Sequence, residues 1–78
     1  MQILTIKTER TNDGFKAWLA DKPNVKSTST GSAYGAAENL AIKVFVGHNH
    51  RAQISEAVLS KIVVTPRQGG GYRATYDA

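Results

Sequence analysis

The sequence lacks cysteine altogether and contains only two prolines, one methionine and one tryptophan among its 78 residues. Without cysteine, neither a disulfide nor a thiolate metal site can form, which is compatible with a reducing cytosol. No apolar run approaches the roughly 18 residues of a membrane span. The first residues also lack the basic start and long apolar stretch of a signal peptide. We therefore expect a cytoplasmic protein that makes no membrane contact.

Acidic residues are few. Six Asp and Glu stand against ten Lys and Arg, which gives a net charge of +4. This excess favours nucleic acid or an acidic protein surface as a partner. The cations are spread along the chain without a Lys/Arg run, so an ordinary solvated surface accounts for them about equally well. The length predicts one domain, residues 1–78, with little room for a deep catalytic cleft beside a core.

Strand signals dominate the chain. Alternating apolar and polar residues, rich in β-branched types and bounded by turn residues, indicate strands. Asn12-Asp13-Gly14 is a tight-hairpin signal, of the kind whose type I′ turn needs positive φ at its centre. The third strand is polar and rich in Ser and Thr, so we expect an edge strand, which could pair with a second copy of the chain. The expected strands are 2–9, 15–20, 25–30, 61–65 and 72–76.

One segment changes to helical periodicity. Between residues 32 and 46, the apolar positions that recur at helical spacing are Ala33, Ala37, Leu40, Ala41, Val44 and Phe45. Thr30 or Ser32 can cap the start, and Gly47 suits the left-handed position after the end. Residues 54–60 fit either a short helix or an extended segment. The predicted fold is α+β: a small, mainly antiparallel sheet (β-β-β-α-β-β) with one long helix on one face, in two layers.

The candidate catalytic and metal motifs are incomplete. His48-Asn49-His50 supplies two imidazoles, and Glu56 is the nearest acid, whereas a closed zinc site needs four ligands. No two acids are placed on one face of one element, and no nucleophile-elbow motif occurs. We expect no enzyme, metal or cofactor. Gly69-Gly70-Gly71 lacks a P-loop tail and predicts a hairpin tip, where the flanking Arg67 and Arg73 could contact phosphate weakly.

Trp18 poses the main question. In strand 15–20, Phe15, Ala17 and Leu19 point to one face, and Lys16 and Trp18 to the other. If the helix covers the first set, Trp18 lies on an open sheet face with Lys16, where Lys7 and Lys26 can join it. There it could stack on single-stranded nucleic acid or anchor a protein interface. The reverse register would bury Trp18 under the helix, as its high average burial favours.

The first 46 residues resemble the N-terminal domain of HicB-type antitoxins. The resemblance rests on Ile3-Leu-Thr-Ile6, Asp13-Gly14-Phe15-Lys-Ala17, Ser27-Thr-Ser-Thr-Gly31 and Ala36-Ala-Glu-Asn-Leu-Ala41. It implies a reduced, catalytically inactive RNase H-like domain of three strands and one helix that covers a small toxin nuclease. The layout also looks like that of some phage anti-CRISPR proteins, which are small, single-domain and cysteine-poor. A phage-encoded member would act in the host cytoplasm.

These observations lead to two functional hypotheses. The first is a small non-catalytic inhibitor that binds and occludes a bacterial nucleic-acid-acting effector, either a toxin nuclease or a CRISPR complex. The alternative is a single-stranded nucleic-acid (RNA) binding module that uses a basic, aromatic sheet face. Both use the same expected contact residues: Trp18, Lys16, Lys7, Lys26, Arg67 and Arg73.

Overall fold

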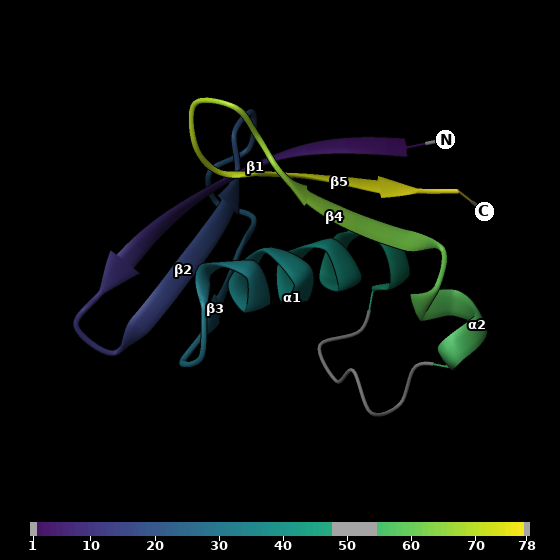
Figure 1. The fold of residues 1–78 in the computed structure, drawn as a ribbon, viewed down its shortest axis with the longest axis horizontal. Helices are drawn as coiled ribbons and strands as arrows, with labels where there is room; N and C mark the ends of the chain where they lie inside the picture. Colours follow the sequence, from purple (N-terminus) through teal and green to yellow (C-terminus); the bar gives the residue numbers. More distant parts are fainter. Residues whose placement is uncertain (1, 48–54, 78) are drawn as a thin grey trace.

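A computed structural model describes residues 2–47 and 55–77 as one sheet with one long helix packed against it (Figure 1). The elements in chain order are β1 (Gln2–Thr11), β2 (Gly14–Leu19), β3 (Lys26–Ser29), α1 (Ala33–Val46), α2 (Glu56–Leu59), β4 (Ile62–Pro66) and β5 (Tyr72–Tyr76). The sheet order is β3-β2-β1-β5-β4, and every neighbouring pair is antiparallel. The predicted α+β class and element order are therefore confirmed.

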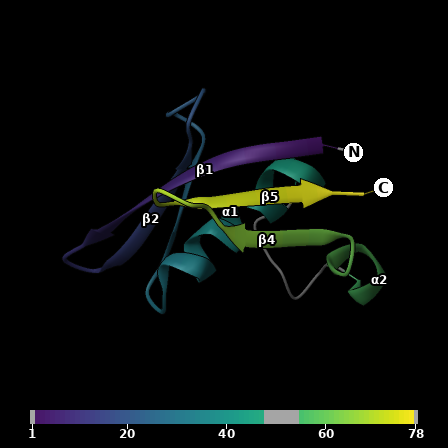
Figure 2. The same cartoon turned by 45° about the horizontal axis from the view of Figure 1, so that its top comes forward.

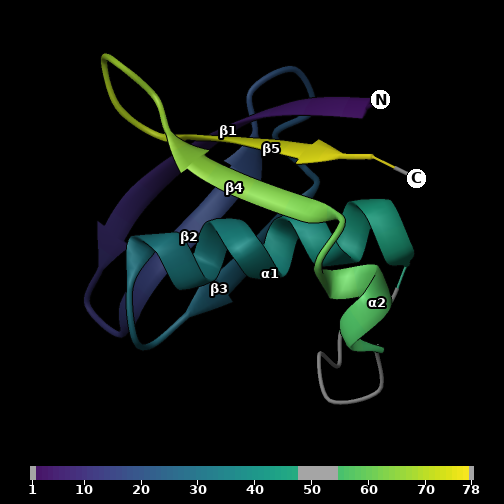
Figure 3. The same ribbon diagram turned by 45° about the vertical axis from the view of Figure 1, so that its right-hand side comes forward.

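Helix α1 lies along one side of the sheet, and the other side is left open (Figure 2). The helix begins where expected: of the two candidate caps, Ser32 is the one used, because its hydroxyl accepts the Gly35 amide at 2.9 Å. It ends at Gly47, whose φ of 82° is left-handed, as predicted. Within the ambiguous segment 54–60, residues Glu56–Leu59 form a helix, which lies at the end of the molecule where α1 ends (Figure 3).

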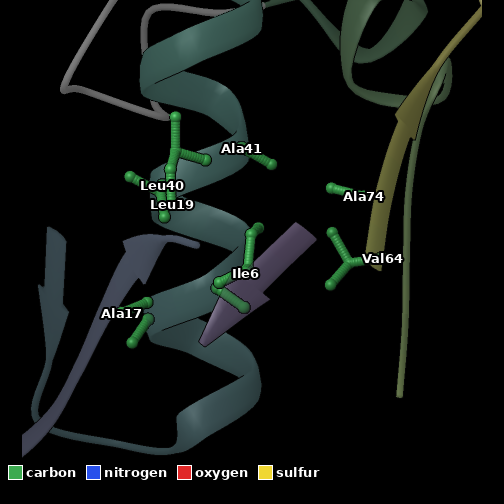
Figure 4. Close-up of a cluster of buried hydrophobic side chains, with 9 residues drawn as sticks. Ile6, Ala17, Leu19, Leu40, Ala41, Val64 and Ala74 are labelled. Carbon is green, nitrogen blue, oxygen red and sulfur yellow. The ribbon is translucent and has the colours of Figure 1, made fainter. Parts of the chain in front are cut away.

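The core is small and built largely from alanine. Ile6 and Leu40 are the largest fully buried side chains, at 0% exposure, among the described residues. Figure 4 shows Ile6 with Ala17 and Leu19 to one side and Val64 and Ala74 to the other, all facing α1. The small alanine side chains of α1 allow the helix to approach the sheet closely.

The buried stripe on α1 differs in part from the predicted one. Ala36 and Ile42 are buried although the helical pattern did not select them, whereas Ala33, Val44 and Phe45 are only half-buried. Ala36 belongs to the same core cluster as Leu40, so it is buried against the sheet, all five strands of which contact α1. Ile42 is not part of that cluster: two residues after Leu40, it lies on nearly the opposite side of the helix.

The first hairpin forms as expected but with different turn geometry. Thr11 pairs with Gly14, so Asn12 and Asp13 make the loop. Neither takes positive φ, since no described non-glycine residue does, and the type I′ expectation is therefore wrong. The unusual dihedral falls on Gly14 instead, with φ of 142°. A Cβ there would collide with the Ser29 carbonyl of β3, so glycine is required where two strands approach closely.

Strand β3 is an edge strand, as predicted, but its edge is partly covered. The Asn39 side-chain amide donates to the Thr28 carbonyl at 3.1 Å, and the Lys43 ammonium donates to the Lys26 carbonyl at 3.1 Å. Edge strands with unpaired backbone groups invite pairing with other chains. Here α1 uses these two carbonyls within the same molecule, and the hypothesis that β3 pairs with a second copy gains no support.

Aromatic side chains other than Trp18 join α1 to β5. Tyr34 contacts Tyr72 edge-on with ring centroids 5.9 Å apart, and Phe45 stacks on Tyr76 at 5.3 Å. Tyr72 and Tyr76 therefore lie on the helix side of the sheet.

In the part of the chain that the structure describes, no helix has the length and apolar character needed to cross a membrane.

Candidate binding face

The side of the sheet opposite α1, called the open face below, is built by the register of the five strands. Ala17 and Leu19 are buried beneath α1, at 0% and 5% exposure, so the alternate positions Lys16 and Trp18 point away from the helix. The reverse register, with Trp18 in the core, is therefore wrong. The open-face strand positions are Ile3, Thr5, Lys7, Glu9, Thr11, Gly14, Lys16, Trp18, Lys26, Thr28, Val63, Thr65, Arg73 and Thr75.

Trp18 lies between two lysines. It is paired with Lys7 of β1 on one side and with Lys26 of β3 on the other. Directly opposed residues of antiparallel strands have Cβ atoms about 4.5–5.5 Å apart, close enough for their side chains to interact. The indole is half-buried while both lysines are exposed. An aromatic surface framed by two cations therefore occupies the β1–β2–β3 part of the open face.

Lys16 also contacts this group. Its ammonium lies 5.6 Å from the centroid of the Trp18 ring, within the range of a cation–π interaction. It also forms an ion pair with Glu9 at 3.5 Å, across the β1–β2 ladder. Both side chains are exposed, at 42% for Lys16 and 60% for Glu9, so the pair contributes little stability. Glu9 is the only acid at the open-face strand positions, which are otherwise basic, polar or apolar.

Two shallow hollows meet at Trp18. One, of about 280 Å³, is lined by Glu9, Lys16, Trp18, Pro23 and Lys26. The other, of about 300 Å³, lies toward the β4–β5 hairpin and is lined by Lys7, Thr8, Trp18, Arg67 and the three glycines 69–71. The two together contain Trp18, Lys16, Lys7, Lys26 and Arg67, residues widely separated in the sequence. The structure thus brings four of the other five predicted contact residues around the Trp18 indole.

The sixth predicted residue, Arg73, lies further along the same face. It is exposed on β5 and pairs with Thr5 of β1 and Thr65 of β4. Arg73 does not line either hollow. It extends the positive charge of the open face beyond the Trp18 group instead of contacting it.

An apolar pair lies at the end of the open face beyond Arg73. Ile3 and Val63 are 55% and 51% exposed, and both pair with Thr75 from opposite sides. Sequence reasoning missed this pair, because Ile3 and Val63 read as ordinary strand residues. Only the order β1-β5-β4 places them on the same face, on either side of Thr75. Exposed apolar residues that cluster beside charged ones are typical of protein interfaces.

The structure offers no support for a metal centre or catalytic cluster in the ranges 2–47 and 55–77. No group of three or more His, Asp or Glu gathers there in a way that could hold a metal ion. His48 and His50 lie outside the described residues, and Glu56 is exposed at the start of α2. The open face therefore offers groups for binding: an indole, several cations and two apolar side chains.

Comparison of the chain with protein-family models, with curated proteins and with solved structures finds no match in any of the three. The resemblances to HicB-type antitoxins and to anti-CRISPR proteins stay predictions from the sequence.

Proposed function

We propose that this protein is a small non-catalytic inhibitor that binds a nucleic-acid-acting effector protein and occludes its surface. The observation that carries the proposal is the composition of the open face. Trp18 lies between Lys7 and Lys26, and the same face ends in the exposed pair Ile3 and Val63. Trp and Arg are the residue types that most often dominate binding energy at protein interfaces.

The positive charge of the open face favours partners with an acidic surface. Lys7, Lys26 and Arg73 point outward, and Glu9, the one acid at the open-face strand positions, is already paired with Lys16. A basic face is steered toward an acidic surface, which raises the association rate and disfavours basic partners. The expected contact is therefore an acidic patch on the effector, with Trp18 as the anchor and the apolar pair at one end of the contact.

Capture from a lysate of the source organism tests this proposal. The protein is used as bait with and without nuclease, and the eluates are analysed for both protein and nucleic acid. We expect one defined protein that survives nuclease treatment and whose activity on nucleic acid falls in proportion to added inhibitor. Replacing the apolar pair by Ile3→Ser and Val63→Thr should weaken capture, whereas Lys22→Ala, in the exposed turn before β3, should leave it unchanged.

Single-stranded nucleic acid is the second candidate, and one observation favours it. Trp18 lines both hollows, so a base stacked on the indole would have cations on two sides: Lys16 and Lys26 in one hollow, Lys7 and Arg67 in the other. Binding would release counterions from the nucleic acid. A plot of the logarithm of the association constant against the logarithm of the salt concentration would therefore have a negative slope of roughly 0.7 per phosphate contacted. The Ile3 and Val63 substitutions would then have no effect. A flat salt response would exclude this candidate.

A further inference from the structure

The hollow beside the β4–β5 hairpin differs from the rest of the open face. It is lined by two cations, Lys7 and Arg67, together with Thr8, Trp18 and the glycines 69–71, and no acid lines it. Its volume of about 300 Å³ exceeds that of one small oxyanion and leaves room for part of a larger ligand. Lys7 lies on β1 and Arg67 in the turn after β4, so the fold brings together two cations that are far apart in the sequence.

The hairpin that forms one wall has a defined shape. The Arg67 amide donates to the Gly71 carbonyl at 3.1 Å, and the Gly70 amide donates to the Arg67 carbonyl at 3.2 Å. Gly69, Gly70 and Gly71 all have positive φ, at 93°, 109° and 76°. A side chain on Gly71 would collide with the Ile6 carbonyl, so the absence of a side chain lets the hairpin lie against β1.

Gly69 and Gly70 leave the main chain of the turn without side-chain cover. Apart from their chain neighbours, no atom lies within 4 Å of the position that a Cβ on Gly69 or Gly70 would take. A ligand can therefore approach the backbone at these two residues without meeting a side chain. Glycine-rich turns can bind oxyanions through main-chain N–H groups. Because the Gly70 N–H already donates to the Arg67 carbonyl, Gly69 is the residue to which this argument applies.

We infer that this hollow is a binding subsite for a phosphate group, contacted by Lys7, Arg67 and the glycine hairpin. The planar guanidinium of Arg67 suits bidentate contact with phosphate oxygens, while Lys7 supplies a point charge. Trp18 forms the adjoining wall, where a base attached to the phosphate would stack. The inference rests on the proposed function because the subsite is part of the open face. It names the chemical group, phosphate, that this part of the face binds. The phosphate could come from a nucleotide, from a nucleic-acid strand held by the effector, or from free phosphate.

Titration of the intact protein at constant ionic strength tests the subsite and separates these sources. The ligands are inorganic phosphate, adenosine, adenosine 5′-monophosphate and a short single-stranded oligonucleotide. Two signals are recorded: the fluorescence of the single tryptophan, and the amide resonances of Gly69, Gly70 and Gly71. Arg67→Gln removes the guanidinium while its main-chain hydrogen bonds stay available. Arg10→Gln is the matched control, because Arg10 is an exposed arginine of β1 that lies on the other side of the sheet from Lys7.

Saturable shifts of the glycine amides are expected with the phosphate-bearing ligands, and adenosine should produce none. Arg67→Gln should weaken binding about tenfold or more, and Arg10→Gln should not. A stronger response to the nucleotide than to inorganic phosphate would identify a nucleotide or strand as the source. Equal binding by Arg67→Gln, equal shifts with adenosine, or no saturable shift would overturn the inference. Failure here is distinct from failure of the proposed function, which depends on capture of a protein and on Ile3 and Val63.

Discussion

Lys7 and Trp18 lie directly opposite each other on β1 and β2, on the face that α1 leaves open. Lys26 of β3 flanks the same indole from the other side. A large aromatic residue of a small domain usually contributes more stability inside the core, so its placement between two lysines needs an explanation. Binding to an acidic partner supplies one.

The ion pair between Glu9 and Lys16 is expected to affect binding more than stability. Glu9→Gln should change the free energy of unfolding by less than about 1 kcal/mol, because both side chains are exposed to solvent. The substitution also removes the one acid among the open-face strand positions, so association with an acidic partner should become faster at low salt. Urea unfolding and stopped-flow association measure the two effects. A large loss of stability would contradict this account of the pair.

The small core predicts a strong dependence on Leu40. This side chain is fully buried between α1 and the sheet, among residues that are mainly alanine. Leu40→Ala should cost about 2–5 kcal/mol, because a cavity remains where its branched end packed. Chemical unfolding followed by circular dichroism measures the loss, with the exposed Lys22→Ala as the neutral control. A change below about 1 kcal/mol would show that the helix is not packed as described.

Two glycines with positive φ should differ in their tolerance of alanine. Gly47 has φ of 82° and open space around the position of a Cβ, so Gly47→Ala should cost about 1–2 kcal/mol from the backbone alone. Gly14 has φ of 142°, and a Cβ there would also collide with the Ser29 carbonyl. Gly14→Ala should therefore cost at least about 1 kcal/mol more than Gly47→Ala. Unfolding curves of the two variants, measured side by side, test the difference, and equal costs would contradict the close approach of β2 and β3.

The element order was predictable because local signals are strong in this chain. Alternation marked the strands, and Ser32 and Gly47 marked the ends of α1. The geometry of the turn at Asn12 and Asp13 was harder to predict. It is set by the contact between Gly14 and β3, which the local sequence does not specify. The burial of Ala36 and Ile42 likewise depends on tertiary packing around the helix, which the helical pattern does not specify.

The candidate site shows the same division. Alternation along the strand was enough to group Trp18 with its lysines on one face. It did not show which face is buried, and the burial of Ala17 and Leu19 in β2 decides that point. The position of Arg67 next to Lys7, and of Ile3 near Val63, depends on the order β1-β5-β4. That order is a long-range pairing of the first and last strands, and no local signal in either strand specifies it.

The most direct test of the central claim is the affinity of Trp18→Ala for the captured effector, measured beside Tyr34→Ala. Tyr34 is an exposed aromatic residue of α1, on the helix side of the molecule, and serves as the matched control. Both variants are first shown to be folded by circular dichroism. The account predicts that Trp18→Ala weakens binding by about 30-fold or more, equivalent to about 2 kcal/mol. Tyr34→Ala should stay within about threefold of the unmodified protein. An unchanged affinity of folded Trp18→Ala would contradict the claim that the open face is the binding surface.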